Sequence, residues 1–225
     1  MPRMIADNIK SVTQRIAKCC EKTGRPAGSV QLVCVTKEAS VSQMLEAARA
    51  GIKIFGENRV QDAARKHAAI GNRAEWHLIG HLQTNKARDA VGIFSLIHSV
   101  DSVRLADAID KEAGRIGKRQ DILVQVNISG EKSKFGIPPE SAAGVLKEIV
   151  ACPNISIRGL MTIAPEADDP EEVRPYFAGL RQILEKVNVE LGTNYSMLSM
   201  GMSNDFEVAV EEGATLVRIG RAIFR

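Results

Sequence analysis

Short apolar runs alternate with amphipathic segments along almost the whole chain. The runs are rich in valine, isoleucine and leucine, as buried strands are, and the segments between them repeat apolar residues at helical spacing. The predicted strands are residues 30–36, 52–57, 75–80, 94–100, 121–128, 155–163, 197–201 and 215–220. The pattern therefore predicts eight strand and helix units in succession.

The predicted helices begin and end at residues with recognisable roles. An opening helix comes before the first strand, and its apolar face is formed by Ile5, Ile9, Val12, Ile16 and Cys19. Ser40 marks the start of the helix after the first strand, and Asp169 and Pro170 provide a cap and a first-turn proline for a later helix. Gly51 and Gly213 suit the left-handed conformation in which many helices end.

This order of elements predicts an α/β protein with a parallel sheet. Parallel neighbours need a connection of helix length, which the segments between the strands provide. Eight such units favour a single (β/α)8 TIM barrel with an extra N-terminal helix, formed by residues 1–225 as one domain. An open doubly wound sheet is the alternative, but no GxGxxG follows the first strand and no GxxxxGK[ST] occurs.

Composition and charge exclude several classes of protein. Apolar residues make up 44% and charged residues 25% of the chain, so neither disorder nor a fibrous repeat is expected. The net charge of +3 is dispersed and aromatic residues are few, so we expect no nucleic-acid partner. No signal-peptide or membrane-spanning segment is present, which predicts a cytoplasmic protein. The cysteines, which lack metal-type spacing, are expected to be reduced and are Cys19, Cys20, Cys34 and Cys152.

Polar residues gather where the predicted strands end, which is the reactive face of a (β/α)8 barrel. The candidates for a binding site are Lys37, Asn58, His77, Ser199, Gly201, Ser203, Arg218, Gly220 and Arg221. His77 and His81 have the spacing of a zinc motif, but they fall on a strand and a loop without an HExxH glutamate. We therefore expect no metal site.

The last two strands carry the glycine, serine and arginine residues expected of a phosphate site. Gly201 permits close approach of the backbone, and Ser203 can either cap the helix that runs to Glu212 or reach a phosphate oxygen. A lysine opposite such a site, Lys37, indicates an imine with an aldehyde that carries a phosphate, and pyridoxal 5'-phosphate is that aldehyde. Arg218 is a candidate partner of its pyridine nitrogen, with a structural ion pair to Glu57 or Asp205 as the alternative role.

Ordered motifs over nearly the whole chain resemble the pyridoxal phosphate homeostasis proteins, which share the barrel of the N-terminal domain of alanine racemase. The matching stretches are VTK at 35–37, FGEN at 55–58, WHLIGHLQTNK at 76–86, NISGEKSKFG at 127–136, GLM at 159–161, LSMGMSNDFEVAV at 198–210 and VRIGRAIF at 217–224. The resemblance implies the barrel of fold-type III pyridoxal phosphate proteins.

The resemblance also assigns roles to individual residues. It implies that Lys37 holds the cofactor as an imine, with Asn58 beside the ring and Arg218 facing the pyridine nitrogen. It implies that the phosphate is bound by a group formed by Ser203, Gly220 and the amide of Arg221. Two features depart from the family: a serine or threonine is common where Arg221 stands, and the usual tail after the final IF is missing.

The function that the resemblance implies is cofactor homeostasis and delivery without strong catalysis. The expected partners are pyridoxal phosphate and the apo forms of enzymes that use it, and the expected state is a monomer or a weak dimer. A pyridoxal phosphate-dependent amino-acid racemase is the alternative, although the alanine racemase type takes its second base from a further β-rich domain. A Schiff-base aldolase without cofactor would leave Arg218 unexplained.

Overall fold

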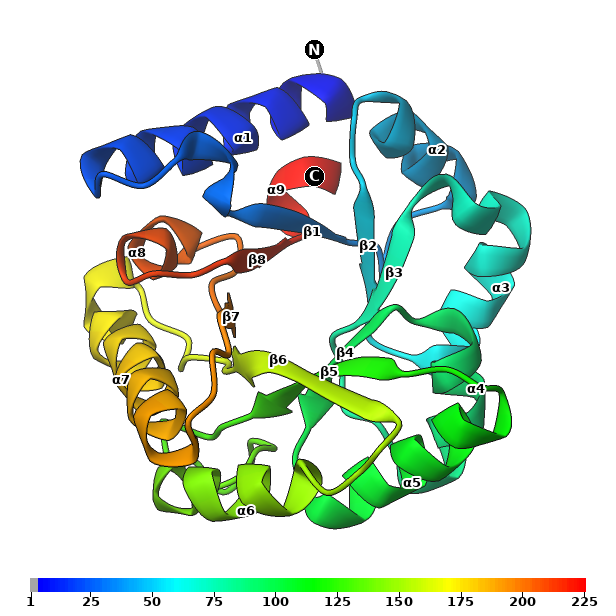
Figure 1. Cartoon of the computed structure of the whole chain (residues 1–225). Coiled ribbons are helices and arrows are strands. Elements are labelled where there is room, and N and C mark those ends of the chain that lie inside the picture. Colours follow the sequence, from blue (N-terminus) through cyan, green and yellow to red (C-terminus); the bar gives the residue numbers. More distant parts are fainter. Residues whose placement is uncertain (1–3) are drawn as a thin grey trace.

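The computed structural model of the protein describes residues 4–225, which form a closed barrel of eight parallel strands with helices outside it (Figure 1). Each strand pairs with its neighbours in sequence, and β1 closes the barrel by pairing with β8. The strands are β1 Gln31–Val35, β2 Ile54–Glu57, β3 Glu75–Leu78, β4 Leu96–Val100, β5 Gln120–Gln125, β6 Ile155–Met161, β7 Met197–Ser199 and β8 Leu216–Ile219. The predicted barrel is confirmed, and the open sheet is excluded.

Several strands end one to three residues earlier than the apolar runs predicted. Ile79 and Ile163 lie just beyond β3 and β6, yet both still contact the apolar cluster inside the barrel. Hydrophobic character therefore extends further than strand pairing does, because the first loop residues still face the barrel axis.

Helices cover the outside of the barrel. The α-helices are α1 Ile5–Lys22, α2 Val41–Arg49, α3 Val60–Ile70, α4 Ala87–Ile93, α5 Val103–Arg115, α6 Ala142–Ile149, α7 Arg174–Leu191, α8 Phe206–Glu211 and α9 Arg221–Phe224. Short 3-10 turns occur at η1 Ala27–Ser29, η2 Gly71–Arg73, η3 Thr84–Lys86, η4 Pro139–Ser141 and η5 Pro170–Val173. Within residues 4–225, no helix combines the length and apolar character needed to cross a membrane.

The predicted helix ends are largely confirmed. Ser40 and Gln43 form a reciprocal capping box at the start of α2. The carboxylate of Asp169 accepts a hydrogen bond from the backbone N–H of Glu171, so it caps η5, the turn that leads into α7. Gly51 and Gly213 have positive φ angles of 100° and 101°, as their predicted positions after helices require.

The opening helix α1 closes the ring of helices where the two ends of the described chain meet. Its predicted apolar face is buried, and the helix packs against α2, α8 and α9 (Figure 1). The side-chain amide of Asn8 donates a hydrogen bond of 2.9 Å to the backbone oxygen of Ile223. Arg15 forms two hydrogen bonds with the carboxylate of Glu207 on α8. These contacts hold the start of the chain against its end.

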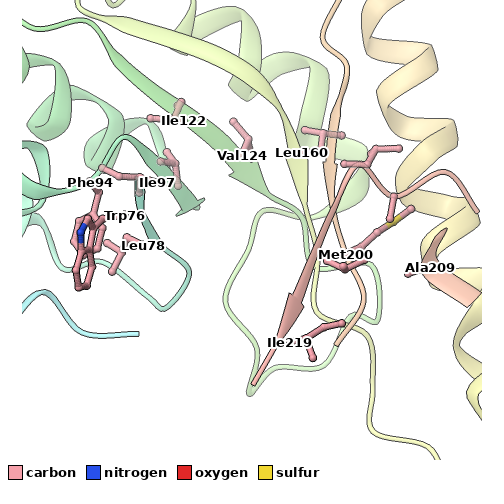
Figure 2. Close-up of a cluster of buried hydrophobic side chains, with 14 of the residues drawn as sticks. Trp76, Leu78, Phe94, Ile97, Ile122, Val124, Leu160, Met200, Ala209 and Ile219 are labelled. Atoms are coloured by element: carbon pink, nitrogen blue, oxygen red, sulfur yellow. The ribbon is translucent and has the colours of Figure 1, made fainter. Parts of the chain in front are cut away.

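Alternation along the strands divides the apolar residues into two layers. The outer layer lies between strands and helices, and Figure 2 shows part of it with labels on Trp76, Leu78, Phe94, Ile97, Ile122, Val124, Leu160, Met200, Ala209 and Ile219. The inner layer fills the barrel and consists of Val33, Ile54, Ile79, Leu96, Leu123, Met161 and Leu216. Inward positions closer to the carboxyl ends of the strands are left for polar residues.

We predict that Gly159→Ala strongly destabilises the barrel. Gly159 lies on β6 next to a register shift between β5 and β6, and an added Cβ atom would lie 1.9 Å from the backbone oxygen of Met197. Since that oxygen belongs to the backbone of β7, relief requires the strand to move, and we expect a loss of about 3 kcal/mol or more in the free energy of unfolding.

Urea denaturation measures this loss, and Gly144→Ala is the matched control. Gly144 is exposed within α6 and has open space around it, so the same substitution there should stabilise by about 0.5–1 kcal/mol. Equal stability of the Gly159→Ala variant and the parent protein would contradict the close packing of β6 on β7.

Candidate functional site

Lys37 lies at the mouth of the barrel, two residues beyond the end of β1. Its side chain is exposed and lines a cavity of about 130 Å3 together with Gly220, Arg221 and Phe224. Alternation along β1 puts Lys37 on the same side as Val33 and Val35, which belong to or contact the inner layer. The lysine and the last loop of the barrel, far apart in sequence, therefore meet at one opening.

A buried ion pair fixes the backbone just before Lys37. Lys66 on α3 donates hydrogen bonds of 2.7 Å to Glu57 Oε1 and 2.6 Å to the backbone oxygen of Thr36. The hydroxyl of Thr36 also donates to Glu57 Oε1, at 2.6 Å. Glu57 is fully buried, and the network satisfies its Oε1 atom, while Oε2 has no hydrogen-bond partner within residues 4–225. The same network holds the segment that carries Lys37. Lys66 was not among the predicted site residues.

The loops after β7 and β8 are built around two glycines. Gly201 has a φ angle of 92°, and a Cβ atom there would lie 2.6 Å from the Cβ atom of Ala209. At Gly220, an added Cβ atom would lie 3.0 Å from the backbone oxygen of Val35. A larger residue at Gly201 would push the loop after β7 away from α8, and one at Gly220 would push the loop after β8 away from β1. The glycines therefore keep both loops close to the barrel mouth.

Ser203 links these two loops and does not cap α8, which corrects one of its two predicted roles. Its hydroxyl accepts a hydrogen bond of 3.4 Å from the backbone N–H of Ala222, in the first turn of α9. The cap residue of α8 is Asp205, because the chain makes an additional turn before the helix begins. Ser203 is therefore placed beside the start of α9, where the phosphate-binding role was predicted.

Arg218 is buried inside the barrel, deeper than its predicted place at the mouth. Its side chain is only 4% exposed, and it donates hydrogen bonds of 2.7 Å to Ser199 Oγ and 2.9 Å to the backbone oxygen of Thr162. Within residues 4–225 it forms no salt bridge, and Glu57 pairs with Lys66 instead. Burial lowers the pKa of Arg218 to about 10, while Asp205 acts on Arg218 only as a nearby negative charge that raises its pKa. The guanidinium therefore stays charged near neutral pH.

Two buried histidines continue the polar interior from Ser199. His98 Nδ1 lies 2.8 Å from Ser199 Oγ, and His98 Nε2 lies 3.0 Å from His77 Nδ1. Burial lowers the pKa of His77 to about 4 and that of His98 well below its ordinary value, so both rings are neutral at pH 7. His98 was not among the predicted site residues. Its position two residues after the inward-facing Leu96 is the signal that could have identified it.

His81 and Asn58 lie outside this buried chain. His81 is exposed, stacks on Phe135 with ring centroids 3.7 Å apart, and places Nδ1 3.3 Å from the carboxylate of Asp101. Asn58 is half-buried after β2, and its backbone is so close to Gly80 that an added Cβ atom there would lie 2.3 Å from the Asn58 oxygen. Residues 4–225 contain no group of three or more histidine, cysteine, aspartate or glutamate residues able to hold a metal ion.

Six of the nine predicted site residues form two groups. His77, Ser199 and Arg218 belong to one buried hydrogen-bonded chain, while Lys37, Gly220 and Arg221 line one cavity at the mouth. The groups meet at β8, and the backbone N–H of Arg218 also donates 2.9 Å to the oxygen of Gly201. The site therefore combines an accessible amine, glycine-rich loops and a buried cation.

This fold and site define the class of barrel described as the N-terminal domain of alanine racemase, whose family model matches residues 6–225. The chain belongs to the pyridoxal phosphate homeostasis protein family. A member with that name from Aquifex aeolicus is 42% identical over 219 residues, which cover 97% of this chain and 96% of the relative. Another from Pseudomonas aeruginosa is 38% identical over 221 residues, or 98% and 94% of the two chains.

Solved structures agree with this assignment. PipY of Synechococcus elongatus PCC7942, at 36% identity, has a TM-score of 0.89 without pyridoxal phosphate and 0.87 with it bound, over 99% of this chain and 100% of PipY. Alanine racemase of Clostridium difficile has a TM-score of 0.75 at 16% identity and matches 97% of this chain over 56% of its own length. That likeness concerns the fold alone.

We predict that the buried histidines make the protein less stable in mild acid. In the unfolded chain a histidine has a pKa near 6.5, whereas burial keeps His77 and His98 neutral to lower pH. Below about pH 6.5 the unfolded chain therefore binds more protons, and the free energy of unfolding falls by up to about 1.4 kcal/mol per pH unit for each histidine.

Urea denaturation at about pH 7 and about pH 5 measures the slope in a window above the carboxylates. Arg15 lowers the pKa of Glu207, so the stability that Glu207 contributes is lost only below about pH 4.5. Burial raises the pKa of Asp205, so protonation of Asp205 stabilises the folded protein as the pH falls. A free energy of unfolding that does not change over this range would show that His77 and His98 are not buried as neutral rings.

Proposed function

We propose that the protein binds pyridoxal 5'-phosphate, holds it as an imine on Lys37, and serves cofactor homeostasis by storing and delivering it. The observation that carries the proposal is Arg218, a buried guanidinium that forms no hydrogen bond or salt bridge to a carboxylate of the described chain. It lies two residues before Gly220, which lines the cavity of Lys37. A buried cation of this kind requires acceptors that the barrel supplies only in part. The names of the relatives and the bound form of PipY support the same ligand.

The residues present fit this cofactor. Lys37 provides the primary amine for the aldehyde. Gly201 and Gly220 let the backbones of the last two loops pack closely at the mouth, and Ser203 links these loops where the phosphate would bind. Arg221 is exposed at the same opening, where a guanidinium can itself bind phosphate. The remaining members of the proposed cofactor site are Asn58, His77, Ser199 and Arg218.

The same residues favour binding over strong catalysis. When bound, pyridoxal phosphate supplies a reversible carbonyl and an electron-accepting ring. A guanidinium only donates hydrogen bonds, so Arg218 would satisfy a pyridine nitrogen while disfavouring its protonation, and an unprotonated ring is the weaker electron acceptor. Lys37 itself could act as one base, which is why weak amino-acid racemisation is the second candidate function. Apo-enzymes that use pyridoxal phosphate are the proposed recipients.

We predict that borohydride reduction of the loaded protein fixes pyridoxal phosphate on Lys37. Peptide mass mapping should find the adduct there, and Lys37→Ala should abolish both the adduct and the visible absorption. Lys53→Ala is the matched control, because Lys53 is exposed before β2 at the opposite end of the barrel. An adduct mainly on another lysine would contradict the assignment to Lys37.

We also predict that the loaded protein reactivates an apo-transaminase but does not turn over alanine or serine at enzymatic rates. Release needs only water or another amine to replace Lys37, whereas catalysis also needs a positioned general base, worth about a hundred- to ten-thousandfold in rate. Recovered transaminase activity and a chiral amino-acid assay measure the two properties. Sustained racemisation that disappears in Lys37→Ala would favour the racemase, and absence of reactivation would remove delivery from the proposal.

A further inference from the structure

A continuous chain of hydrogen bonds runs across the barrel interior from Arg218 to His77. Arg218 Nη1 lies 2.7 Å from Ser199 Oγ, which lies 2.8 Å from His98 Nδ1, and His98 Nε2 lies 3.0 Å from His77 Nδ1. The members come from β8, β7, β4 and β3, and all are buried. The proposed cofactor site includes Arg218, Ser199 and His77, but the proposed function gives no role to His98.

The chemistry of the first and last members restricts the direction of these bonds. A guanidinium has no acceptor, so Arg218 must donate to Ser199. A neutral imidazole has one donor and one acceptor nitrogen, so the bond between the histidines fixes both tautomers together. Two arrangements remain, in which either His98 donates to His77 or His77 donates to His98.

The surroundings of Ser199 distinguish the two arrangements. If His77 donated to His98, then His98 Nδ1 would carry a proton and would donate to Ser199, whose oxygen would accept from both sides. Of the hydrogen bonds formed within residues 4–225, the Ser199 hydroxyl takes part only in those to Arg218 and His98. Its own proton would then be buried without an acceptor, which is costly. In the opposite arrangement, the hydroxyl donates to His98 Nδ1, His98 Nε2 donates to His77 Nδ1, and the protons of both Ser199 and His98 have acceptors.

The far end of the chain agrees with this choice. When His98 donates to His77 Nδ1, the proton of His77 lies on Nε2. That atom lies 3.8 Å from the carboxylate of Glu75, so a donor faces a negative charge. The opposite arrangement would place a nitrogen lone pair towards the same carboxylate, which is unfavourable.

We propose that the chain runs in one direction, from Arg218 through Ser199 and His98 to His77, with both histidines protonated on Nε2, and that His98 is a positioning residue for Arg218. Because the Ser199 proton is committed to His98, a lone pair of the hydroxyl stays available to Arg218. The Thr162 oxygen holds the other guanidinium nitrogen. The guanidinium is then fixed at two points, and its remaining N–H groups are free to face a ligand.

This inference rests on the proposed function only where it concerns the cofactor ring. Every donor in the chain points away from Arg218, so no neighbour can pass a proton towards the ring nitrogen through it. His98 would therefore act through Ser199 to keep Arg218 a fixed donor, and thereby to keep the ring nitrogen unprotonated.

The tautomers are measurable in cofactor-free protein, which separates this inference from cofactor binding. The protein has four histidines, so His67→Gln and His81→Gln variants suffice to assign the signals of His77 and His98. Long-range proton–nitrogen NMR of protein labelled with nitrogen-15 should show a protonated Nε2 and an unprotonated Nδ1 in both rings. A proton on Nδ1 of either ring overturns the direction, whether or not the protein binds pyridoxal phosphate.

The positioning role of His98 requires a pair of variants. His98→Leu removes the acceptor for Ser199, whereas His98→Asn places an amide oxygen near the position of Nδ1. We expect His98→Leu to weaken pyridoxal phosphate binding about tenfold and His98→Asn to restore most of that loss. The pH profile of the cofactor absorption should move in His98→Leu and return in His98→Asn.

A merely structural role would lower thermal stability in both variants and leave the absorption profile unchanged, and that result would overturn the positioning role. If the parent protein fails to bind pyridoxal phosphate at all, the proposed function is wrong, and the nitrogen NMR alone decides the direction of the chain. Nitrogen NMR of His77 in the His98→Asn variant shows whether the barrel interior has kept its folded arrangement.

Discussion

A positive charge inside an apolar barrel is the constraint on which the site depends. The guanidinium of Arg218 is buried next to the inner layer of apolar side chains, and its hydrogen-bond partners within the described chain are neutral oxygens. An uncompensated buried charge is costly, so such a group persists only where its surroundings or a ligand satisfy it. The orientation of Ser199 and the electronic character expected of a bound ring follow from this charge, while burial keeps the two histidines neutral.

The fold could be predicted from the sequence because each layer of a (β/α)8 barrel leaves a local signal. Buried parallel strands appear as apolar runs, and the helices between them carry an apolar face. Alternation along the last strand indicates that Arg218 faces inward, because it comes two residues after the inward-facing Leu216. Its burial is not evident from the sequence, because an arginine near a strand end is ordinarily exposed. Its place inside the barrel becomes evident only when β8 pairs with β1 and β7.

Other parts of the site depend on contacts that no local pattern encodes. In the sequence His98 is an isolated histidine within an apolar run, and its hydrogen-bond partners belong to β3 and β7. Lys66 is one of several polar residues on α3, yet it reaches the buried Glu57 and the segment before Lys37. The failure of Ser203 as a helix cap has a different cause, because an additional turn before α8 shifts the cap to Asp205. Local propensity cannot reveal such tertiary pairings.

Closure of the barrel by β1 and β8 has a kinetic consequence. The hydrogen bond from Asn8 to the backbone of Ile223 joins residues separated by 215 positions, and the register of β1 with β8 joins Gln31 to Leu216. Contacts of such long sequence separation incur the entropy of closing a long loop before they stabilise the chain, and they slow folding. We therefore expect the contacts between β1 and β8 beneath α1 to form late in folding. The cavity of Lys37 is lined by Val35 of β1 and by the segment after β8, so it is complete only once the barrel has closed.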